Sequence, residues 1–305
     1  MSDRATDRAD VPRIDATRPA RAVPEIAPAA RGTLVLLGGA TSVDGRAFTS
    51  FLELVNGFSG GRIVGLTAAS TMPGESASFW RATFRQAGAA RVEIPEFDRR
   101  SPAVDERVAA MVREADGIFL GGGDQVTLVT ALSGTRTAIA IKERYREGGV
   151  VCGTSAGAAA LSTLTMAGGE IDREGNLVAQ YIGPGLGLLG YDAIIDTHFS
   201  QRRRLQRLFF VVAGNTELLG VGIDEDTALI VRGDVGEVVG AGGVTFVDGR
   251  DTVRFDNADD LDTGRQLTLS HLRVGIVGTR HHLNLREREL HELVVGQASP
   301  HRRRA

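Results

Sequence analysis

The sequence predicts an α/β fold with a doubly wound, mostly parallel β-sheet and with further β-strands added toward the C-terminus. Between residues 33 and 160, short apolar runs that end in Gly- or Ser-rich turns alternate with segments of helical periodicity. This alternation is typical of βα units that build a parallel sheet. Beyond residue 218 the pattern changes to short β runs with glycine turns, and we interpret these as added strands and hairpins of the same domain.

The apolar runs place the first strands at 33–37, 62–66, 91–94, 117–120 and 149–152, with helices near 45–58, 76–88 and 105–115 between them. A strand near 194–198 and a helix near 201–213 follow, and later strands are expected at 220–224, 228–231, 237–239, 244–247 and 272–277. Parallel sheets carry their sites at the carboxyl ends of the strands. The turns that start at Gly38, Ser70, Gly121 and Gly153 should therefore gather at one edge.

Composition indicates one folded domain between two polar tails. Of the 305 residues, we expect 1–31 to be a disordered tail, 32–290 to be a single α/β domain and 291–305 to be a charged tail. A net charge of −3 argues against a nucleic-acid partner. No apolar run approaches the ~18 residues of a membrane span, so we expect a cytoplasmic protein without a membrane partner. The one cysteine, Cys152, excludes an intrachain disulfide and should pack inside the sheet.

The most informative motif is the G-x-S-x-G sequence of Gly153, Ser155 and Gly157. An apolar run precedes it and an alanine-rich segment follows, so it fits a strand–turn–helix elbow that exposes a nucleophilic serine. Free N–H groups at the start of the helix would point at a developing oxyanion. An ordinary glycine-rich turn is the alternative interpretation.

His198 is the candidate base for Ser155. It ends an apolar run and stands apart from the other histidines, which all lie at position 271 or beyond. A serine hydroxyl needs such a neighbouring base. Two further patterns are weak evidence for a functional site. The G-x-G-x-x-G of residues 185–190 lacks the βαβ context of a nucleotide site. The acidic run 224–226 lacks histidines at the spacing of metal ligands.

Four motifs in one order resemble the cyanophycinases, serine peptidases related to aspartyl dipeptidases. They are residues 121–125, residues 153–158, residues 196–199 with Arg202, Arg204 and Arg207, and residues 222–228. Cyanophycinases cut cyanophycin, a poly-aspartate chain with arginine on each side-chain carboxyl, and release β-aspartyl-arginine dipeptides. The resemblance implies this activity, with no metal or cofactor. It also implies that the sheet is of the class I glutamine-amidotransferase-like, flavodoxin-like type.

The resemblance further implies a triad of Ser155, His198 and an acid that lies between them in the sequence. Glu174 is the preferred acid, and Glu170 and Asp172 are alternatives. Asp196, two residues before the histidine, is expected to line the pocket instead.

The remaining site residues are expected around this triad. The N–H of Ala156 and one from Gly122 or Gly123 are the candidate oxyanion donors. Gln125 matches a substrate-contacting glutamine, although it would also suit a helix start beside an Asp124 N-cap. Arg202, Arg204 and Arg207 are candidates to bind substrate carboxylates, with a solvated helix face as the alternative. Thr197 departs from the glutamine usual in this family and leaves the substrate detail open.

Three alternatives to a cyanophycinase remain. An α/β-hydrolase esterase shares the elbow, but this sequence lacks the oxyanion loop that such an enzyme carries before the elbow, and His198 lies only 43 residues after Ser155. An aspartyl dipeptidase that acts on short peptides is the nearest, and a catalytically silent amidotransferase-like binding protein is the non-enzyme alternative. A homodimer stays open, because the sequence does not give the oligomeric state.

Overall fold

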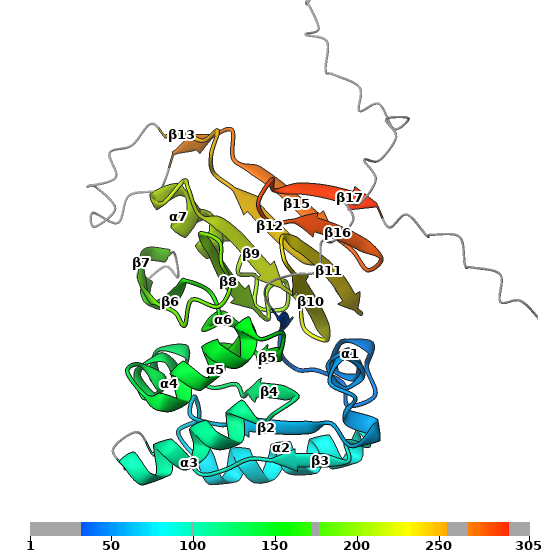
Figure 1. Ribbon diagram of the computed structural model, residues 1–305. Helices are drawn as coiled ribbons and strands as arrows, with labels where there is room; N and C mark the ends of the chain where they lie inside the picture. Colours follow the sequence, from blue (N-terminus) through cyan, green and yellow to red (C-terminus); the bar gives the residue numbers. More distant parts are fainter. Residues whose placement is uncertain (1–31, 99–100, 172–176, 255–267, 293–305) are drawn as a thin grey trace, which may run out of the picture.

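The computed structural model describes residues 32–98, 101–171, 177–254 and 268–292 (Figure 1). The expected tail of residues 1–31 lies outside these ranges. The described helices are α1 (Arg46–Leu54), α2 (Pro73–Gln86), α3 (Pro102–Arg113), α4 (Gln125–Leu132), α5 (Arg136–Arg146), α6 (Ala156–Ala159) and α7 (Leu205–Gly214), with one 3-10 turn at Gly57–Ser59. Among the described residues, no helix is both long and apolar enough to span a membrane.

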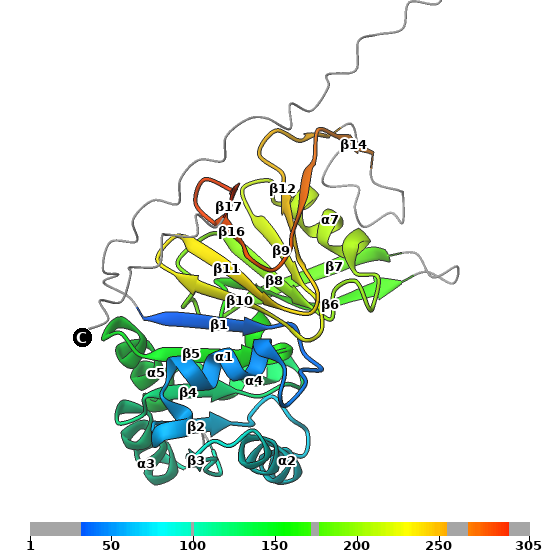
Figure 2. The ribbon, with the colours of Figure 1, turned by 90° about the vertical axis from the view of Figure 1, so that its right-hand side faces the viewer.

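A nine-stranded sheet forms the centre of the described chain, in the order β17-β16-β11-β10-β1-β5-β4-β2-β3. Its parallel strands are β1 (Thr33–Leu37), β2 (Arg62–Leu66), β3 (Arg91–Glu93), β4 (Gly117–Leu120) and β5 (Val150–Thr154). Its antiparallel strands are β10 (Thr227–Arg232), β11 (Val235–Gly240), β16 (His281–Asn284) and β17 (Glu289–Glu292). Figure 2 shows β1 at the junction between the two kinds of pairing.

A second, six-stranded sheet has the order β15-β12-β9-β8-β6-β7. It contains β6 (Leu164–Ile171), β7 (Leu177–Pro184), β8 (Ala193–Thr197), β9 (Leu219–Ile223), β12 (Val244–Asp248) and β15 (Arg273–Val277). Strands β8 and β9 are parallel neighbours, with Asp196 opposite Gly222 and Thr197 opposite Ile223. A separate pair is formed by β13 (Val253–Arg254) and β14 (Leu269–Ser270).

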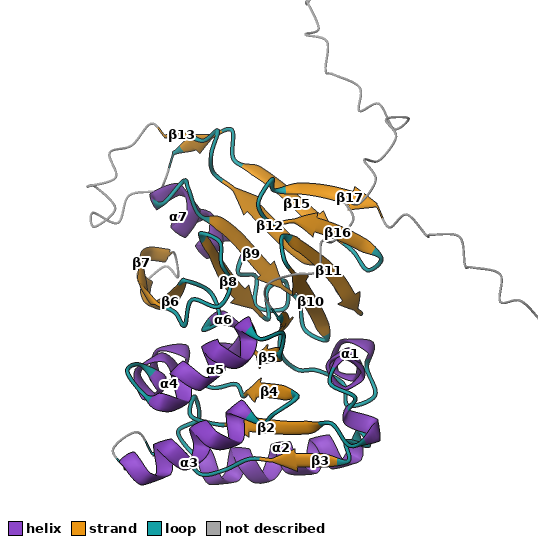
Figure 3. Ribbon diagram, in the orientation of Figure 1, coloured by secondary structure: helices purple, strands orange, loops and turns teal. Residues whose placement is uncertain are grey.

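Helices cover both faces of the parallel strands, as Figure 3 shows in purple. One face packs on α1 and α2 through an aromatic cluster that includes Phe48, Phe84 and Phe119. The other face packs on α3 and α5, where Val108 and Ile141 belong to the same apolar cluster as the strand residues. Strands buried on both sides read as continuous apolar runs rather than as alternating ones. The predicted fold class, a doubly wound and mostly parallel sheet with added β-strands, is confirmed.

Local sequence signals set the helix starts. Ser101, Asp124 and Thr135 are N-caps, and each side chain accepts a hydrogen bond from a backbone N–H three residues on. Cys152 is fully buried in β5, as expected, and burial raises the pKa of its thiol well above the usual value. This thiol is therefore a poor nucleophile near neutral pH.

Several expectations differ from the structure. The apolar pattern predicts neither the β6–β7 hairpin nor the second sheet that contains β8 and β9. The helix after the elbow, α6, has only four residues. The domain extends past residue 290, because His291 lies in β17 and is 5% exposed rather than part of a solvated tail. Strand β17 pairs with β16, and β16 pairs with β11, so both C-terminal strands belong to the nine-stranded sheet.

A buried carboxylate holds the C-terminal strands together. Asp248, at the end of β12, is 3% exposed and lies within hydrogen-bonding distance of Arg250, Arg273 and Arg288, with N–O distances of 2.9, 2.8 and 2.6 Å. Burial by itself would raise the pKa of the Asp248 carboxyl, but hydrogen bonds from Arg250 and Arg288 outweigh burial and hold that pKa well below its usual range. Because Arg288 lies in the β16–β17 turn, this ion pair ties the two sheets to each other.

We expect Asp248→Asn to lower the free energy of unfolding at pH 7 by about 2 kcal/mol, because Arg288 then stays buried without a charged partner while the other two arginines reach solvent. The depressed pKa means that the carboxylate stabilises the fold above its unfolded-state pKa of about 4, and that this contribution is lost as the pH falls. In urea titrations, the difference in unfolding free energy between wild type and mutant should therefore begin to shrink below about pH 4 and should vanish only below the depressed folded-state pKa of Asp248.

Asp234→Asn is the matched control. Asp234 pairs with Arg286 at the surface, with side-chain exposures of 41% and 68%, so its loss should cost less than about 0.5 kcal/mol. Equal destabilisation by the two changes would contradict the structural role of Asp248.

Candidate active site

Ser155 lies in a sharp turn between β5 and α6, as the G-x-S-x-G motif predicts. Its φ of 52° is positive, an uncommon and strained value for a residue with a side chain. The flanking glycines are required by space: a Cβ on Gly153 would lie 2.4 Å from the carbonyl oxygen of Gly157, and one on Gly157 would lie 2.2 Å from that of Leu120. The turn therefore presents the serine hydroxyl at the carboxyl end of the parallel strands.

His198 follows directly after β8 and faces the serine. Its Nε2 lies 3.0 Å from Ser155 Oγ, within hydrogen-bonding reach. His198 also has a positive φ, 49°, so the backbone bends away from the direction of β8 at this residue. The predicted pairing of Ser155 with His198 is thus present in the geometry.

Glu225 is the carboxylate that contacts the other side of the imidazole. Its Oε1 lies 2.6 Å from His198 Nδ1, and the two side chains are 33% and 12% exposed. This position was expected for Glu174, and the structure puts Glu225 there instead. Glu174 and Asp172 lie outside the described residues, and the side chain of Glu170 is not described either.

The parallel pairing of β8 with β9 explains why Glu225 reaches the histidine. Thr197 is opposite Ile223 at the ends of these strands, so the residues that follow, His198 and Glu225, leave the sheet at the same edge. The neighbouring acids shape the turn: Asp224 accepts hydrogen bonds from the N–H groups of Ser200 and Gly243. A sequence signal for this carboxylate exists, since the acidic run 224–226 follows an apolar run, but the sequence does not show that this strand end lies beside His198.

Backbone carbonyl groups at the end of β1 accept hydrogen bonds from each of the three segments that carry Ser155, His198 and Glu225. Ser155 N–H donates to Leu37 O at 3.0 Å, His198 N–H to Gly38 O at 2.8 Å and Asp226 N–H to Gly39 O at 3.0 Å. Side chains would not fit here. A Cβ on Gly38 would lie 1.9 Å from a backbone oxygen of the acidic turn, and one on Gly39 would lie 2.4 Å from the imidazole of His198.

The expected oxyanion donors lie beside the nucleophile. Ala156 is the first residue of α6, where backbone N–H groups have no partner within the helix. A Cβ on Gly122 would be 3.4 Å from Ser155 Cβ, so this loop passes directly over the serine. Gly123 has a φ of +143° and lines the adjacent pocket. The geometry thus gathers the three predicted donor residues around Ser155.

A pocket of about 90 Å³ opens beside Ser155 and is lined by all six predicted substrate residues, Gln125, Asp196, Thr197, Arg202, Arg204 and Arg207. Ser155 and the predicted oxyanion residues Gly123 and Ala156 also line it. Gln125 is the first residue of α4, after the Asp124 N-cap, and its amide donates to Met166 O at 2.5 Å. Both interpretations of Gln125 therefore hold for its position: it starts a helix and it faces the pocket.

Two of the three arginines bind Asp196. This carboxylate is 1% exposed and accepts hydrogen bonds from Arg204 Nη1 at 3.1 Å and from Arg207 Nε at 2.6 Å. Arg202 is exposed, and within the described residues its guanidinium has no hydrogen-bond or ion-pair partner. The alternative interpretation, a solvated helix face, does not describe these arginines, because Arg202 and Arg204 precede α7 and all three line the pocket.

The pocket carries more positive than negative charge. Burial lowers the pKa of Arg204, as do the neighbouring charges of Arg207 and Arg202, while Asp196 acts in the opposite direction. One carboxylate thus faces three guanidinium groups. A bound anion would relieve the repulsion between these groups.

The glycine-rich stretch 185–190 lies in the loop between β7 and β8. Its leucines, Leu186, Leu188 and Leu189, are buried in the main apolar cluster. The stretch therefore packs the core and does not open a helix after a strand, which is the context of a dinucleotide site.

A parallel α/β sheet that presents a serine bonded to histidine, and through it to a carboxylate, defines an enzyme of the serine hydrolase class. The family comparison makes this assignment specific. The model of peptidase family S51 matches residues 34–239. The chain belongs to this family and is a serine-type peptidase.

Curated relatives of the chain include cyanophycinases. The protein from Synechococcus elongatus is 33% identical over 265 residues, which cover 85% of this chain and 81% of the relative. The protein from Trichormus variabilis is 34% identical over 260 residues, or 84% and 87% of the two chains. A solved peptidase from an acI-B1 Actinobacterium shares the fold, with a TM-score of 0.58 at 24% identity over 72% of this chain and 91% of that one.

We expect Gly39→Ala to lower the rate at which a small fluorophosphonate labels Ser155 by about 10²-fold, because the new methyl group would displace the His198 ring by an ångström or more. The rate of labelling, followed by gel fluorescence on folded protein, measures this effect. Gly60→Ala is the matched control: Gly60 also has a strongly positive φ, +107°, but nothing lies within 4 Å of a Cβ there. Equal loss in both mutants would attribute the effect to backbone strain and not to the histidine.

Proposed function

We propose that this peptidase hydrolyses cyanophycin to β-aspartyl-arginine dipeptides as a serine exopeptidase, through an acyl-enzyme. The observation that carries the proposal is the junction of two features: the hydrogen-bonded chain Ser155–His198–Glu225 opens onto a pocket lined by three arginines. The similarity to cyanophycinases over more than four fifths of both chains supports the same substrate.

In the acylation step, Ser155 Oγ attacks the backbone carbonyl of the aspartyl chain. His198 Nε2, at 3.0 Å, takes the hydroxyl proton as the new C–O bond forms. Glu225 accepts a hydrogen bond from the Nδ1–H group of His198. This contact keeps Nε2 as the proton acceptor and stabilises the imidazolium. The proton then passes from Nε2 to the leaving amine as the C–N bond breaks.

The oxyanion of the tetrahedral intermediate would lie between the N–H of Ala156 and an N–H of the Gly122–Gly123 loop. Donors held by a fixed backbone need no reorganisation as the charge develops, and each such donor is worth roughly 3 to 4 kcal/mol of transition-state stabilisation. In deacylation, a water molecule takes the place of the amine, and His198 removes a proton from this water as the water oxygen bonds to the acyl carbon. His198 then returns the proton to Ser155 Oγ as the acyl–oxygen bond breaks, which restores the serine.

The arginines supply the substrate selectivity of the proposal. Each repeat of cyanophycin carries a free carboxylate on its β-linked arginine, and the chain end carries another. Arg202 has no partner among the described residues and is the best placed to form a bidentate pair with such a carboxylate. Arg204 and Arg207 share Asp196, so they present a fixed and only partly neutralised positive surface.

An aspartyl dipeptidase remains the second candidate, and the observation that favours it is Thr197. This residue lines the pocket and is 4% exposed, and it stands where cyanophycinases usually have a glutamine. A pocket that lacks the glutamine would lose one donor and one acceptor for the polymer.

The deciding experiment is incubation with purified cyanophycin, followed by mass spectrometry of the products. Release of β-aspartyl-arginine by wild type but not by Ser155→Ala supports the proposal. Poly-aspartate that lacks arginine should not be cleaved. Cleavage of short aspartyl peptides with cyanophycin left intact would favour the dipeptidase.

For the triad, we expect Ser155→Ala and His198→Ala each to reduce kcat on the order of 10⁶-fold. Glu225→Gln should cost roughly 10⁴-fold, because the amide keeps the shape but loses the charge that stabilises imidazolium. Steady-state kinetics on cyanophycin measure these losses. Glu174→Gln is the control and should stay near wild type; the reverse pattern would return the acid role to Glu174.

For the pocket, Arg202→Ala should lower kcat/KM for cyanophycin by roughly 10- to 150-fold, the cost of one charge-assisted hydrogen bond. Fluorophosphonate labelling of Ser155 should be unchanged, since the nucleophile does not depend on this arginine. Arg203→Ala is the matched control, because Arg203 is exposed and does not line the pocket. Equal effects at 202 and 203 would mean that general surface charge, and not a specific contact, governs binding.

A further inference from the structure

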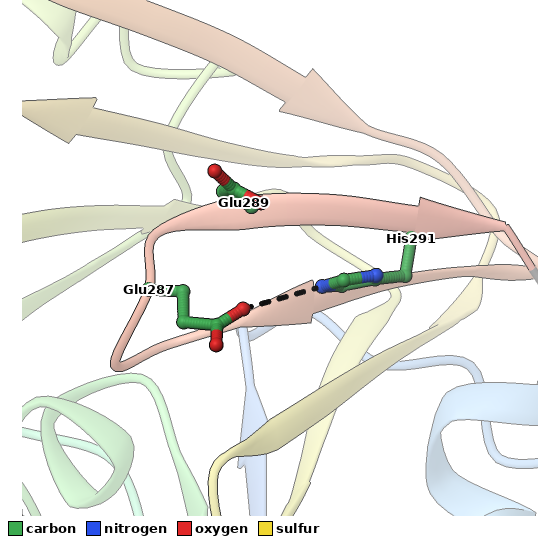
Figure 4. Close-up of side chains that lie close together, drawn as sticks. All are labelled: Glu287, Glu289 and His291. Atoms are coloured by element: carbon green, nitrogen blue, oxygen red, sulfur yellow. Dashed lines mark ion pairs between the residues drawn. The ribbon is translucent and has the colours of Figure 1, made fainter. Parts of the chain in front are cut away.

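The β16–β17 hairpin gathers two glutamates and a histidine at the edge of the nine-stranded sheet (Figure 4). One possible ligand atom from each of Glu287, Glu289 and His291 lies within 4.8 Å of the others. Glu289 and His291 are two apart on β17 and so share a face of the strand. Glu287 approaches from the turn between the two strands. The group is distinct from the candidate active site and from the residues of its pocket.

His291 is the member of this group whose environment needs an explanation. Its side chain is 4% exposed, and neither ring nitrogen has a hydrogen-bond partner among the residues that the structure describes. Nε2 points toward Glu287 Oε2 but lies 3.9 Å from it, beyond hydrogen-bonding distance. A buried polar group without a partner is costly, and such groups in native proteins often mark a missing ion or water.

A second histidine repeats this environment. His282 stands directly opposite His291 in the β16–β17 pairing, and its Nδ1 is also buried without a partner in the described chain. The face of the hairpin that carries His291 thus presents two imidazole rings beside two carboxylates.

We propose that Glu287, Glu289 and His291 bind one divalent transition-metal cation, with Zn²⁺ as the best match. Imidazole with carboxylates is a ligand set that suits zinc, whereas magnesium and calcium prefer oxygen alone. Ligand atoms around zinc lie about 2.0 to 2.2 Å from the metal. Glu287 is 52% exposed, so its side chain is able to move inward and close the site around the ion.

The cation would act as a structural clamp on the hairpin. The turn that carries Glu287 also carries Arg288, whose guanidinium is bonded to buried Asp248. A metal at His291 would fix the strand on the other side of this turn. Ligand binding to the folded state alone raises its apparent stability, so zinc should stabilise the C-terminal edge without altering the chemistry at Ser155.

The test is titration of the full-length protein, freed of metal with a chelator, with ZnCl₂ by isothermal calorimetry and thermal denaturation. We expect one Zn²⁺ per chain and a rise in Tm. His291→Gln, Glu287→Gln and Glu289→Gln should each weaken binding by more than about 10-fold, the loss typical even for an outer-shell partner. His281→Gln is the matched control, since His281 is exposed and its side chain points to the opposite face of β16.

The proposal would be overturned if wild type did not bind Zn²⁺, or if His291→Gln, Glu287→Gln and Glu289→Gln all bound it with unchanged affinity. An equal loss in His281→Gln would also overturn it, because zinc would then bind through accessible imidazoles in general. If His291→Gln does not fold, the two exposed glutamates decide the matter, as their replacement leaves the core intact.

Discussion

The arrangement of the active site depends on the end of β1, where two glycines allow three backbone segments to approach one strand. Carbonyl groups of Leu37, Gly38 and Gly39 accept hydrogen bonds from the turns that carry the serine, the histidine and the acid. No side chain fits at Gly38 or Gly39 without meeting the acidic turn or the imidazole. Because β1 pairs in parallel with β5 and antiparallel with β10, it is also the strand that joins the two kinds of pairing in the nine-stranded sheet. A single short strand thus sets the relative positions of Ser155, His198 and Glu225.

The two sheets contribute different parts of the candidate active site. The parallel strands carry Ser155 and the Gly122–Gly123 loop, whereas β8 and β9 of the second sheet carry His198 and Glu225. Positive φ angles at Ser155 and His198 represent local strain, which persists only where surrounding structure determines the backbone. Here the hydrogen bonds to β1 provide that determination. The positively charged pocket lies between these contributions, with Asp196 at the end of β8 and the arginines in the segment that follows.

The sequence predicted the parallel half of the fold well, because its buried strands are continuous apolar runs and its turns are rich in glycine. It also predicted Ser155 and His198, whose positions follow from a strand end. It did not predict Glu225 as the partner of His198, since that contact requires knowing that β8 and β9 are parallel neighbours across an intervening helix. The arginines show the same limit: Asp196 binds Arg204 and Arg207 through a bend in the chain that helical periodicity does not encode. The sequence assigns His291 to the charged tail 291–305 because charged residues surround it, whereas its burial depends on the pairing of β17 with β16.

The burial of Cys152 has a practical consequence. It is the single cysteine of the chain, it is fully buried in β5, and burial raises the pKa of its thiol. Thiol-directed reagents and mild oxidants should leave the folded protein untouched, since they act on accessible thiolates. The natural sequence is therefore already a suitable background for site-specific labelling: one cysteine introduced at the pocket rim, or on the β16–β17 hairpin, would carry a spectroscopic probe with no need to remove the native residue.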